Sequence, residues 1–139
     1  MTENLDNVFV YGTLKVGGYF SYNSVFNENR VCTRVGYIRA RLYDLGNFPG
    51  IKLSRYKKDV VHGEIHRYKN IENVLERMDW IEGYNAEKEG GLFVRKTVIA
   101  HELFHSPKVK GEREVYVYVY EFNENIKKYT HVKSGLWEV

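Results

Sequence analysis

Glu82 is the residue of this chain whose type and position best suit acid–base chemistry. The spacing of Ile71, Leu75, Met78 and Glu82 places all four on one face of a helix predicted at about 72–82. Burial on that apolar face disfavours the charged form of a carboxyl group, and the negative end of the helix dipole acts in the same direction. Both effects raise the pKa of Glu82, so that it could act as a general acid or base near neutral pH.

A structural role for the same carboxylate fits the sequence as well. The last residue of a helix often points past the helix end, where Glu82 could pair with a cation such as Arg95. Asp79, on the flank of the helix, is expected to be solvated or to pair locally. Glu64, in a predicted strand beside Gly63, is a weaker second candidate for chemistry.

A second candidate site lies where the first apolar run meets a glycine. The segment 8–11 is typical of a strand, and Gly12, Thr13 and Leu14 follow it directly. A strand that ends at glycine leaves backbone N–H groups unpaired, and the missing Cβ lets a ligand approach the backbone. Such a turn suits an anionic or carbonyl oxygen. A purely structural turn, with Gly12 at a positive φ, fits this local sequence equally well.

The phosphate-loop motif does not explain this turn. Gly12 and Gly17 have the required separation, but Gly18 and Tyr19 stand where the motif needs Lys followed by Ser or Thr. The motif G-x-G-x-x-G does not occur anywhere in the chain. Nucleotide binding through this turn is therefore not expected.

His101, Glu102 and His105 match the zinc-protease motif H-E-x-x-H. That motif needs a helix, which places both histidines on one metal ion. The residues before it, 97–100, are typical of a strand, and in an extended chain the two histidines would stand roughly 13 Å apart. A zinc hydrolase is therefore the least favoured hypothesis for this chain, and no metal is expected.

Size and composition indicate one globular domain over 1–139, with 43% hydrophobic and 15% aromatic residues. Lys and Arg exceed Asp and Glu by only 21 to 18, and the short basic runs at 55–58 and 108–110 are expected to be solvated turns. No nucleic-acid partner is predicted from them. The single cysteine, Cys32, excludes an internal disulfide, and the segment 1–7 has no basic or apolar leader. A cytoplasmic protein without a membrane partner is expected.

The elements that must position these residues are mostly strands. Alternation of apolar and polar residues predicts strands at 8–11, 31–45, 60–68, 93–101 and 114–122. The long run at 31–45 is broken at Gly36, which indicates a bent strand or a hairpin, and 47–50 is predicted to be a turn. The main helix has Asn70 as its expected N-cap and ends at Gly83. The pattern favours an α+β fold with a curled or closed mixed sheet.

Seven segments spread over nearly the whole chain carry a family resemblance. They are VFVYGTLK, LYDLGNFPGI, VVHGEIHRY, LERMDWIEGYN, FVRKTV, VYVYEF and SGLWEV. The most specific are Tyr-Gly-Thr-Leu at 11–14 and Asp-x-x-Glu-Gly-Tyr at 79–84. Together they resemble the gamma-glutamylcyclotransferase-like family, which includes AIG2-like proteins and gamma-glutamylamine cyclotransferases.

The resemblance implies a small mixed barrel, curled or closed, with one main helix and a cavity between the first turn and the helix end. It implies that Glu82 is the catalytic acid/base. It also implies that Tyr11, Gly12, Thr13 and Leu14 form the substrate-binding loop.

The implied reaction is an intramolecular attack of an α-amine on a γ-carbonyl, which releases 5-oxoproline and an amine or amino acid. An enzyme of this acyltransferase or lyase type needs no metal or organic cofactor, and its partner is a small gamma-glutamyl molecule. The same barrel could instead bind a small metabolite without turning it over, since a fold alone does not establish activity. The leaving group and the oligomeric state are not predicted.

Overall fold

The computed structural model describes residues 5–12, 15, 18, 23–85, 87–88, 90–106 and 108–138. Thr13 and Leu14 of the expected binding loop lie outside the described residues. The elements in chain order are β1 (Asn7–Val10), α1 (Ser24–Asn29), β2 (Arg30–Asp44), β3 (Pro49–Leu53), β4 (Val60–Tyr68), α2 (Ile71–Glu82), β5 (Tyr84–Asn85), β6 (Gly90–Gly91), β7 (Phe93–His105), β8 (Lys110–Phe122) and β9 (Thr130–His131).

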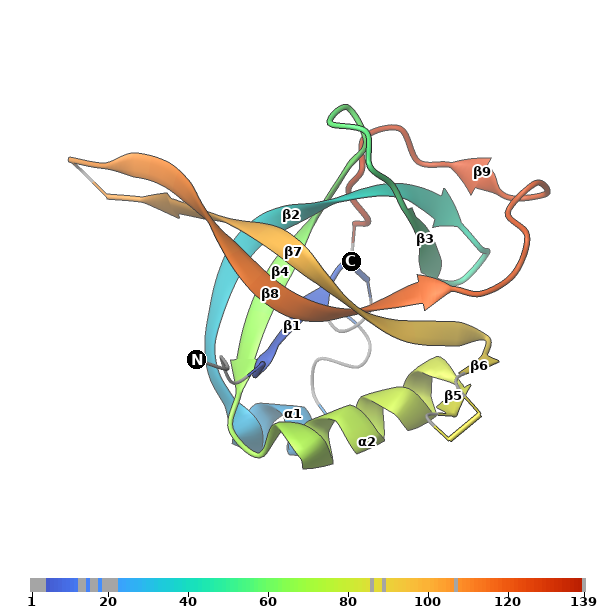
Figure 1. Ribbon diagram of the computed structural model, residues 1–139, viewed down its shortest axis with the longest axis horizontal. Helices are drawn as coiled ribbons and strands as arrows, with labels where there is room; N and C mark the ends of the chain where they lie inside the picture. Colours follow the sequence, from blue (N-terminus) through green and yellow to red (C-terminus); the bar gives the residue numbers. More distant parts are fainter. Residues whose placement is uncertain are drawn as a thin grey trace.

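Five strands close into a barrel in the order β2, β4, β1, β8 and β7, because β7 pairs back onto β2 (Figure 1). In this ring β1 runs parallel to β8, whereas the other neighbouring strands are antiparallel. Both β3 and β9 pair with β2 outside the ring, and β5 pairs with β6. The predicted α+β fold with a closed mixed sheet is confirmed.

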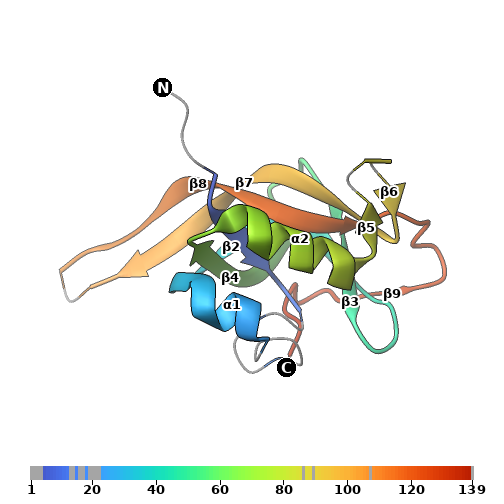
Figure 2. The same ribbon diagram turned by 90° about the horizontal axis from the view of Figure 1, so that it is seen from below.

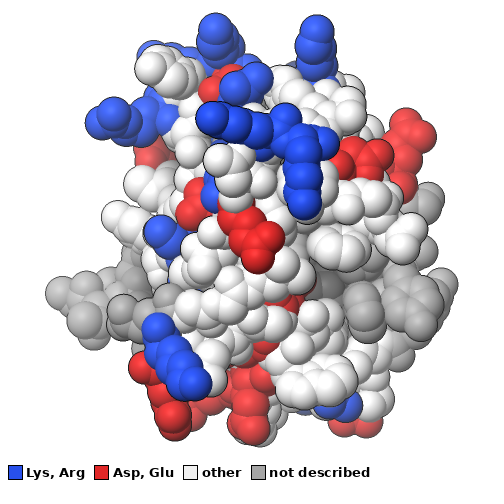
Figure 3. Space-filling view, turned by 90° about the vertical axis from the view of Figure 1, so that its right-hand side faces the viewer, with Lys and Arg blue, Asp and Glu red and all other residues white. Residues whose placement is uncertain are grey.

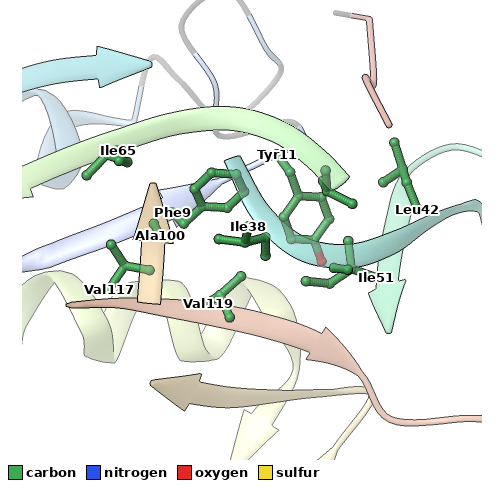
Figure 4. Packing of buried hydrophobic residues seen from close by; sticks show 11 residues of the cluster. Phe9, Tyr11, Ile38, Leu42, Ile51, Ile65, Ala100, Val117 and Val119 are labelled. Atoms are coloured by element: carbon green, nitrogen blue, oxygen red, sulfur yellow. The ribbon is translucent and has the colours of Figure 1, made fainter. Parts of the chain in front are cut away.

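Strand alternation sorts the apolar side chains into two layers. Successive residues of a strand point to opposite faces, so Phe9 and Tyr11 lie inside the barrel, whereas Val8 and Val10 lie outside it. Figure 4 shows how the inner side chains converge from all sides of the barrel. This inner layer consists of Phe9, Tyr11, Ile38, Ala40, Leu42, Ile51, Val61, Ile65, Ala100, Val117 and Val119.

The outer layer lies between the barrel and α2, which crosses the outside of the sheet (Figures 1 and 2). Val74, Leu75 and Met78 are the buried residues of α2, and they pack against Val8 and Val10 of β1 in this layer. The helix therefore uses the apolar face that its sequence predicts. Of the helices in the described part of the chain, none combines the length and the apolar composition needed to cross a membrane.

The two ends of α2 differ in how closely they follow the sequence prediction. Gly83 ends the helix with φ 67°, and its N–H donates to the carbonyls of Asp79 and Trp80. This is the predicted glycine stop. Asn70 stands at the N-cap position, but with φ 52° its side chain caps nothing and donates instead to Asn29 at 2.9 Å. The position of the cap was therefore predicted, but not its hydrogen bonding.

The run predicted at 31–45 is one long bent strand, β2, and not a hairpin. Gly36 pairs on one side with Gly63 and on the other with Glu102. A Cβ built on Gly36 would lie 2.5 Å from the carbonyl oxygen of His101, so the strands of the closing barrel pass each other at this glycine.

The turn predicted at 47–50 was placed two residues too late. Pro49 and Gly50 already belong to β3, and the turn spans 45–48, with the Leu45 N–H donating to the Phe48 carbonyl at 3.0 Å. The last two long strands, β7 and β8, form an antiparallel hairpin and extend beyond the strands predicted at 93–101 and 114–122. The outer end of this hairpin forms a ribbon that projects from the barrel (Figure 1).

Charged side chains of both signs share the face shown in Figure 3. Most lysines and arginines gather toward its upper end, whereas aspartates and glutamates lie at the upper right, in the middle and at the lower end, where a few basic side chains lie as well. This face therefore carries a mixture of basic and acidic side chains and is not uniformly basic.

Candidate active site

A cavity of about 530 Å³ opens at the end of the barrel beside the last turn of α2. Its wall consists of the segments 9–12, 47–49, 81–83 and 92–93, together with Tyr120. Most of these residues are apolar, and among the described residues of the wall Glu82 alone carries a charge. The cavity therefore surrounds one carboxylate with a largely apolar lining.

Glu82 reaches this cavity because it continues the apolar face of α2 by one turn beyond Met78. Burial raises the pKa of Glu82 to about 7, since a low-dielectric site disfavours the carboxylate. No side chain in the described part of the chain forms an ion pair with it. A carboxyl group of this pKa can both accept and donate a proton near neutral pH.

The cation that could have paired with Glu82 is bound elsewhere. Arg95 donates from Nη1 to Oδ2 of Asp79 at 2.6 Å, and the hydroxyl of Tyr120 donates to Oδ1 at 2.6 Å. The expectation that Asp79 is solvated or pairs locally is therefore wrong. Its carboxylate binds side chains of both β7 and β8. The alternative of a Glu82–Arg95 ion pair is not the arrangement found.

Tyr11 and Gly12 lie in the wall of the same cavity as Glu82. The hydroxyl of Tyr11 donates to the backbone carbonyl of Tyr120 at 2.6 Å. Burial, and secondarily the charge of Glu82, raise the pKa of Tyr11, so its phenol stays neutral. A Cβ on Gly12 would lie 2.7 Å from Cγ of Pro49, so this glycine permits a close approach of the chain itself.

Sequence reasoning missed two parts of the cavity wall. Nothing in the sequence marks Tyr120 as functional, because its alternation with Tyr118 along the strand is explained by packing alone. Phe48 and Pro49 were interpreted only as a turn. The resemblance segment LYDLGNFPGI contained both of these residues, but nothing in the local pattern indicated that they face Glu82.

The H-E-x-x-H segment does not form the helical zinc site. His101 and Glu102 belong to β7, and Glu102 accepts hydrogen bonds from Nε of Arg34 at 2.7 Å and Nε of Arg113 at 2.9 Å. This carboxylate therefore ties strands together. Within the described ranges no cluster of three or more His, Cys, Asp or Glu residues could hold a metal ion.

The other candidate side chains have structural partners outside the cavity wall. Oε1 of Glu64 lies 2.8 Å from Nε2 of the buried His66. Arg95 lies over the rings of Tyr84 and Tyr118, 5.5 Å from each centroid. Glu82, Tyr11 and Gly12 are the sequence-predicted site residues that the structure brings together.

Comparisons with known proteins match both the sequence and the fold. The family described as gamma-glutamyl cyclotransferase, AIG2-like matches residues 8–139. The crystal structure of an AIG2-like protein from Mus musculus has a TM-score of 0.61 and 23% identity, over 87% of this chain and 79% of that chain. An uncharacterized protein from Pyrococcus horikoshii has a TM-score of 0.56 and 15% identity, over 96% of this chain and 89% of that chain.

A comparison with curated proteins found no significant match. At identities below 25%, the two solved structures show the shared fold alone. The family match extends over nearly the whole chain and includes both the barrel and the segments that form the cavity wall. The chain therefore belongs to the gamma-glutamyl cyclotransferase, AIG2-like family.

Proposed function

We propose that this protein is a gamma-glutamyl cyclotransferase in which Glu82 is the catalytic acid/base. The observation that carries the proposal is the carboxyl group of Glu82, which forms no ion pair with any described residue and has a pKa of about 7 in the wall of a cavity of about 530 Å³. Membership in the family supports a cyclotransferase activity in general terms. The place of Glu82 in the cavity wall supports its role, whereas the roles of Thr13 and Leu14 rest on the family resemblance alone.

A gamma-glutamyl compound contains its own nucleophile. Its α-amino group can attack the γ-carbonyl carbon, close a five-membered ring and expel the amine that was bound there. Most conformers of the flexible glutamyl chain are unproductive, so an apolar cavity that holds the bent conformer contributes strongly to the rate. The α-amino group has a reference pKa of roughly 8, so it must lose a proton before it can attack.

Glu82 supplies this proton transfer in the proposed mechanism. The α-ammonium group first loses one proton to solvent. The carboxylate of Glu82 accepts a second proton from the attacking nitrogen as the new C–N bond forms, and the resulting carboxylic acid donates that proton to the leaving nitrogen as the old C–N bond breaks. One residue can serve both steps because a pKa near 7 leaves both protonation states accessible. The products are 5-oxoproline and the free amine.

The first turn is proposed to bind the substrate. Tyr11 and Gly12 line the cavity, and the backbone N–H groups of the segment Tyr11, Gly12, Thr13 and Leu14 are proposed to hold the substrate carboxylate or the developing oxyanion. The hydroxyl of Tyr11 is already engaged with the Tyr120 carbonyl, so its ring serves as wall rather than as proton donor.

The test is to incubate the purified protein with a panel of gamma-glutamyl amino acids and gamma-glutamylamines. Mass spectrometry should detect 5-oxoproline and the free amine in equal amounts, and the most active substrate identifies the leaving group. If the folded protein binds members of the panel but releases no 5-oxoproline, the proposal is wrong and the cavity has a binding role.

A further inference from the structure

Asp79 is held by side chains from two strands, one helical turn before Glu82. Tyr120 of β8 donates to its Oδ1 and Arg95 of β7 donates to its Oδ2, each at 2.6 Å. The side chain of Asp79 is only 14% exposed. Hydrogen bonds that involve a charged group are shorter and stronger than neutral ones, and little solvent screens this pair. A single carboxylate therefore fixes the last turns of α2 to the barrel.

The hydrogen bonds continue from Asp79 to the opposite wall of the cavity. Tyr120 presents its hydroxyl to Asp79, and its backbone carbonyl accepts the hydroxyl of Tyr11 at 2.6 Å. Tyr11, Tyr120 and Glu82 all line the cavity. Glu82 follows Asp79 by three residues in the same helix, so this series of bonds connects the last turn of α2 with Tyr11 in the cavity wall.

Arg95 gives Asp79 a second effect on the site. A guanidinium group stays charged in proteins, so an Arg95 released from Asp79 would need another acceptor. Glu82 is the next carboxylate along the helix, and an ion pair there would lower the pKa that acid–base catalysis requires. Among the described residues, the titratable groups around Glu82 and Arg95 are Tyr11, which follows β1, Tyr118 and Tyr120 of β8, Tyr84 of β5 and Asp79 of α2.

We infer that Asp79 is a positioning residue of this site. It holds Arg95 away from Glu82, and through Tyr120 it holds Tyr11 in the cavity wall. The inference deepens the proposed function, and its kinetic consequences rest on that function. Its consequence for the titration of Glu82 does not depend on catalysis.

The first experiment compares Asp79→Asn with the wild type in the titration of Glu82. The side-chain carboxyl carbons are followed by ¹³C NMR across pH, and the Glu82 signal is assigned by its absence in Glu82→Gln. The apparent pKa of Glu82 should fall by about one unit or more in Asp79→Asn, because Arg95 loses its partner. The same pKa of Glu82 in both folded proteins would overturn the inference.

Removing the cation as well should reverse the effect. In the double variant Asp79→Asn/Arg95→Met no guanidinium is released, so the pKa of Glu82 should return toward its wild-type value. The double variant also leaves no unpaired, half-buried cation, so it remains informative if Asp79→Asn alone does not fold. A pKa that stays low in the double variant would contradict the role given to Arg95.

Glu102→Gln is the matched control, because Glu102 also bridges two partners and its side chain is 5% exposed. It lies in β7 outside the cavity wall, so its loss should leave the titration of Glu82 unchanged. An equal shift of the Glu82 pKa in this control would mean general loosening of the fold, and the inference would fail.

Kinetics then separate this inference from the proposed function. With an active substrate, kcat of Asp79→Asn should fall about 10- to 100-fold with KM changed much less, because misplacement affects the transition state. Tyr120→Phe should lower kcat as well. The variant Asp79→Asn/Tyr120→Phe should be no slower than the slower of the two single variants. Additive losses of kcat would show that Asp79 and Tyr120 act independently, and would contradict the inference. A wild type that turns over nothing refutes the proposed function, whereas the NMR titration still decides the inference.

Discussion

Glu82 combines two properties that rarely occur together in a stable protein, namely a partly buried carboxyl group and no ion-pair partner among the described residues. The unfolded chain would titrate this group near its ordinary pKa of 4.5, whereas the folded protein holds it at about 7. Folding therefore favours the protonated form. Since the deprotonated form is the one that starts the proposed reaction, the site works at the expense of stability near neutral pH.

Glu82→Gln should accordingly stabilise the protein at high pH. The stabilising contribution of protonated Glu82 is fully present below pH 4.5 and is lost as the pH rises through about 7. At about pH 8 the variant should exceed the wild type in free energy of unfolding by up to about 3 kcal/mol, and near pH 4 the two should be similar. Urea unfolding at several pH values measures the difference. A difference that does not change with pH would refute this linkage.

The activity should depend on pH in the opposite sense. Because the base must be deprotonated, kcat should decrease as the pH falls through about 7. The measurement is the initial rate at saturating substrate between about pH 5 and pH 9. A constant kcat over this interval would show that Glu82 does not titrate in the rate-limiting step.

At the residue scale the sequence predicted Glu82 but not its surroundings. The helical period sufficed to place Glu82 on the buried face, because Leu75 and Met78 share that face. The bonds of Asp79 to Arg95 and Tyr120 join a helix to two strands far away in sequence. No local sequence pattern encodes a contact between residues so far apart, so only the tertiary structure brings these three side chains together.

At the scale of elements, the end of α2 sets where Glu82 lies. Gly83 has φ 67°, a conformation that costs a residue with a Cβ about 1 kcal/mol. Gly83→Ala should therefore lower the free energy of unfolding by about that amount, since a Cβ there would have room, 3.6 Å from Cβ of Leu92. Gly90→Ala, at a glycine outside the left-handed region, is the control and should cost less. Equal losses of unfolding free energy in Gly83→Ala and Gly90→Ala would contradict the cost assigned to the left-handed conformation of Gly83.

The accuracy of the strand predictions depended on what surrounds each strand. The strand at 60–68 was predicted with its exact ends, because polar residues flank the segment on both sides, at 57–59 and at 69–70. The turn at 47–50 was misplaced, because Pro49 and Gly50 usually mark turns. Their pairing with Asp44 and Tyr43 of β2 overrides that tendency, and only the tertiary structure supplies it.

At the scale of the whole molecule, closure of the barrel depends on two glycines that pair with each other, Gly36 and Gly63. A Cβ on Gly63 would collide with the carbonyl of Val10 and lie 2.7 Å from the ring of Phe9. At Gly36 the sequence predicted a bent strand or a hairpin. The pairing of β2 with β7 that closes the ring was not predicted, because register between distant strands has no local signal.

Gly63→Ala should therefore destabilise the protein more than Gly83→Ala. The added methyl group meets backbone and a packed ring, and overpacking of this kind costs about 3 kcal/mol. Chemical denaturation of both variants under the same conditions makes the comparison. A loss for Gly63→Ala no larger than that for Gly83→Ala would show that the barrel relaxes easily at this crossing.

The most direct test of the whole account is the rate of 5-oxoproline release by the wild type and by Glu82→Gln, measured side by side with the best gamma-glutamyl substrate. Glu76→Gln, an exposed glutamate of the same helix, is the control and should keep the wild-type rate. Loss of the general acid/base should slow Glu82→Gln by about 100- to 10,000-fold while the protein stays folded. Wild-type rates in folded Glu82→Gln would contradict the central claim.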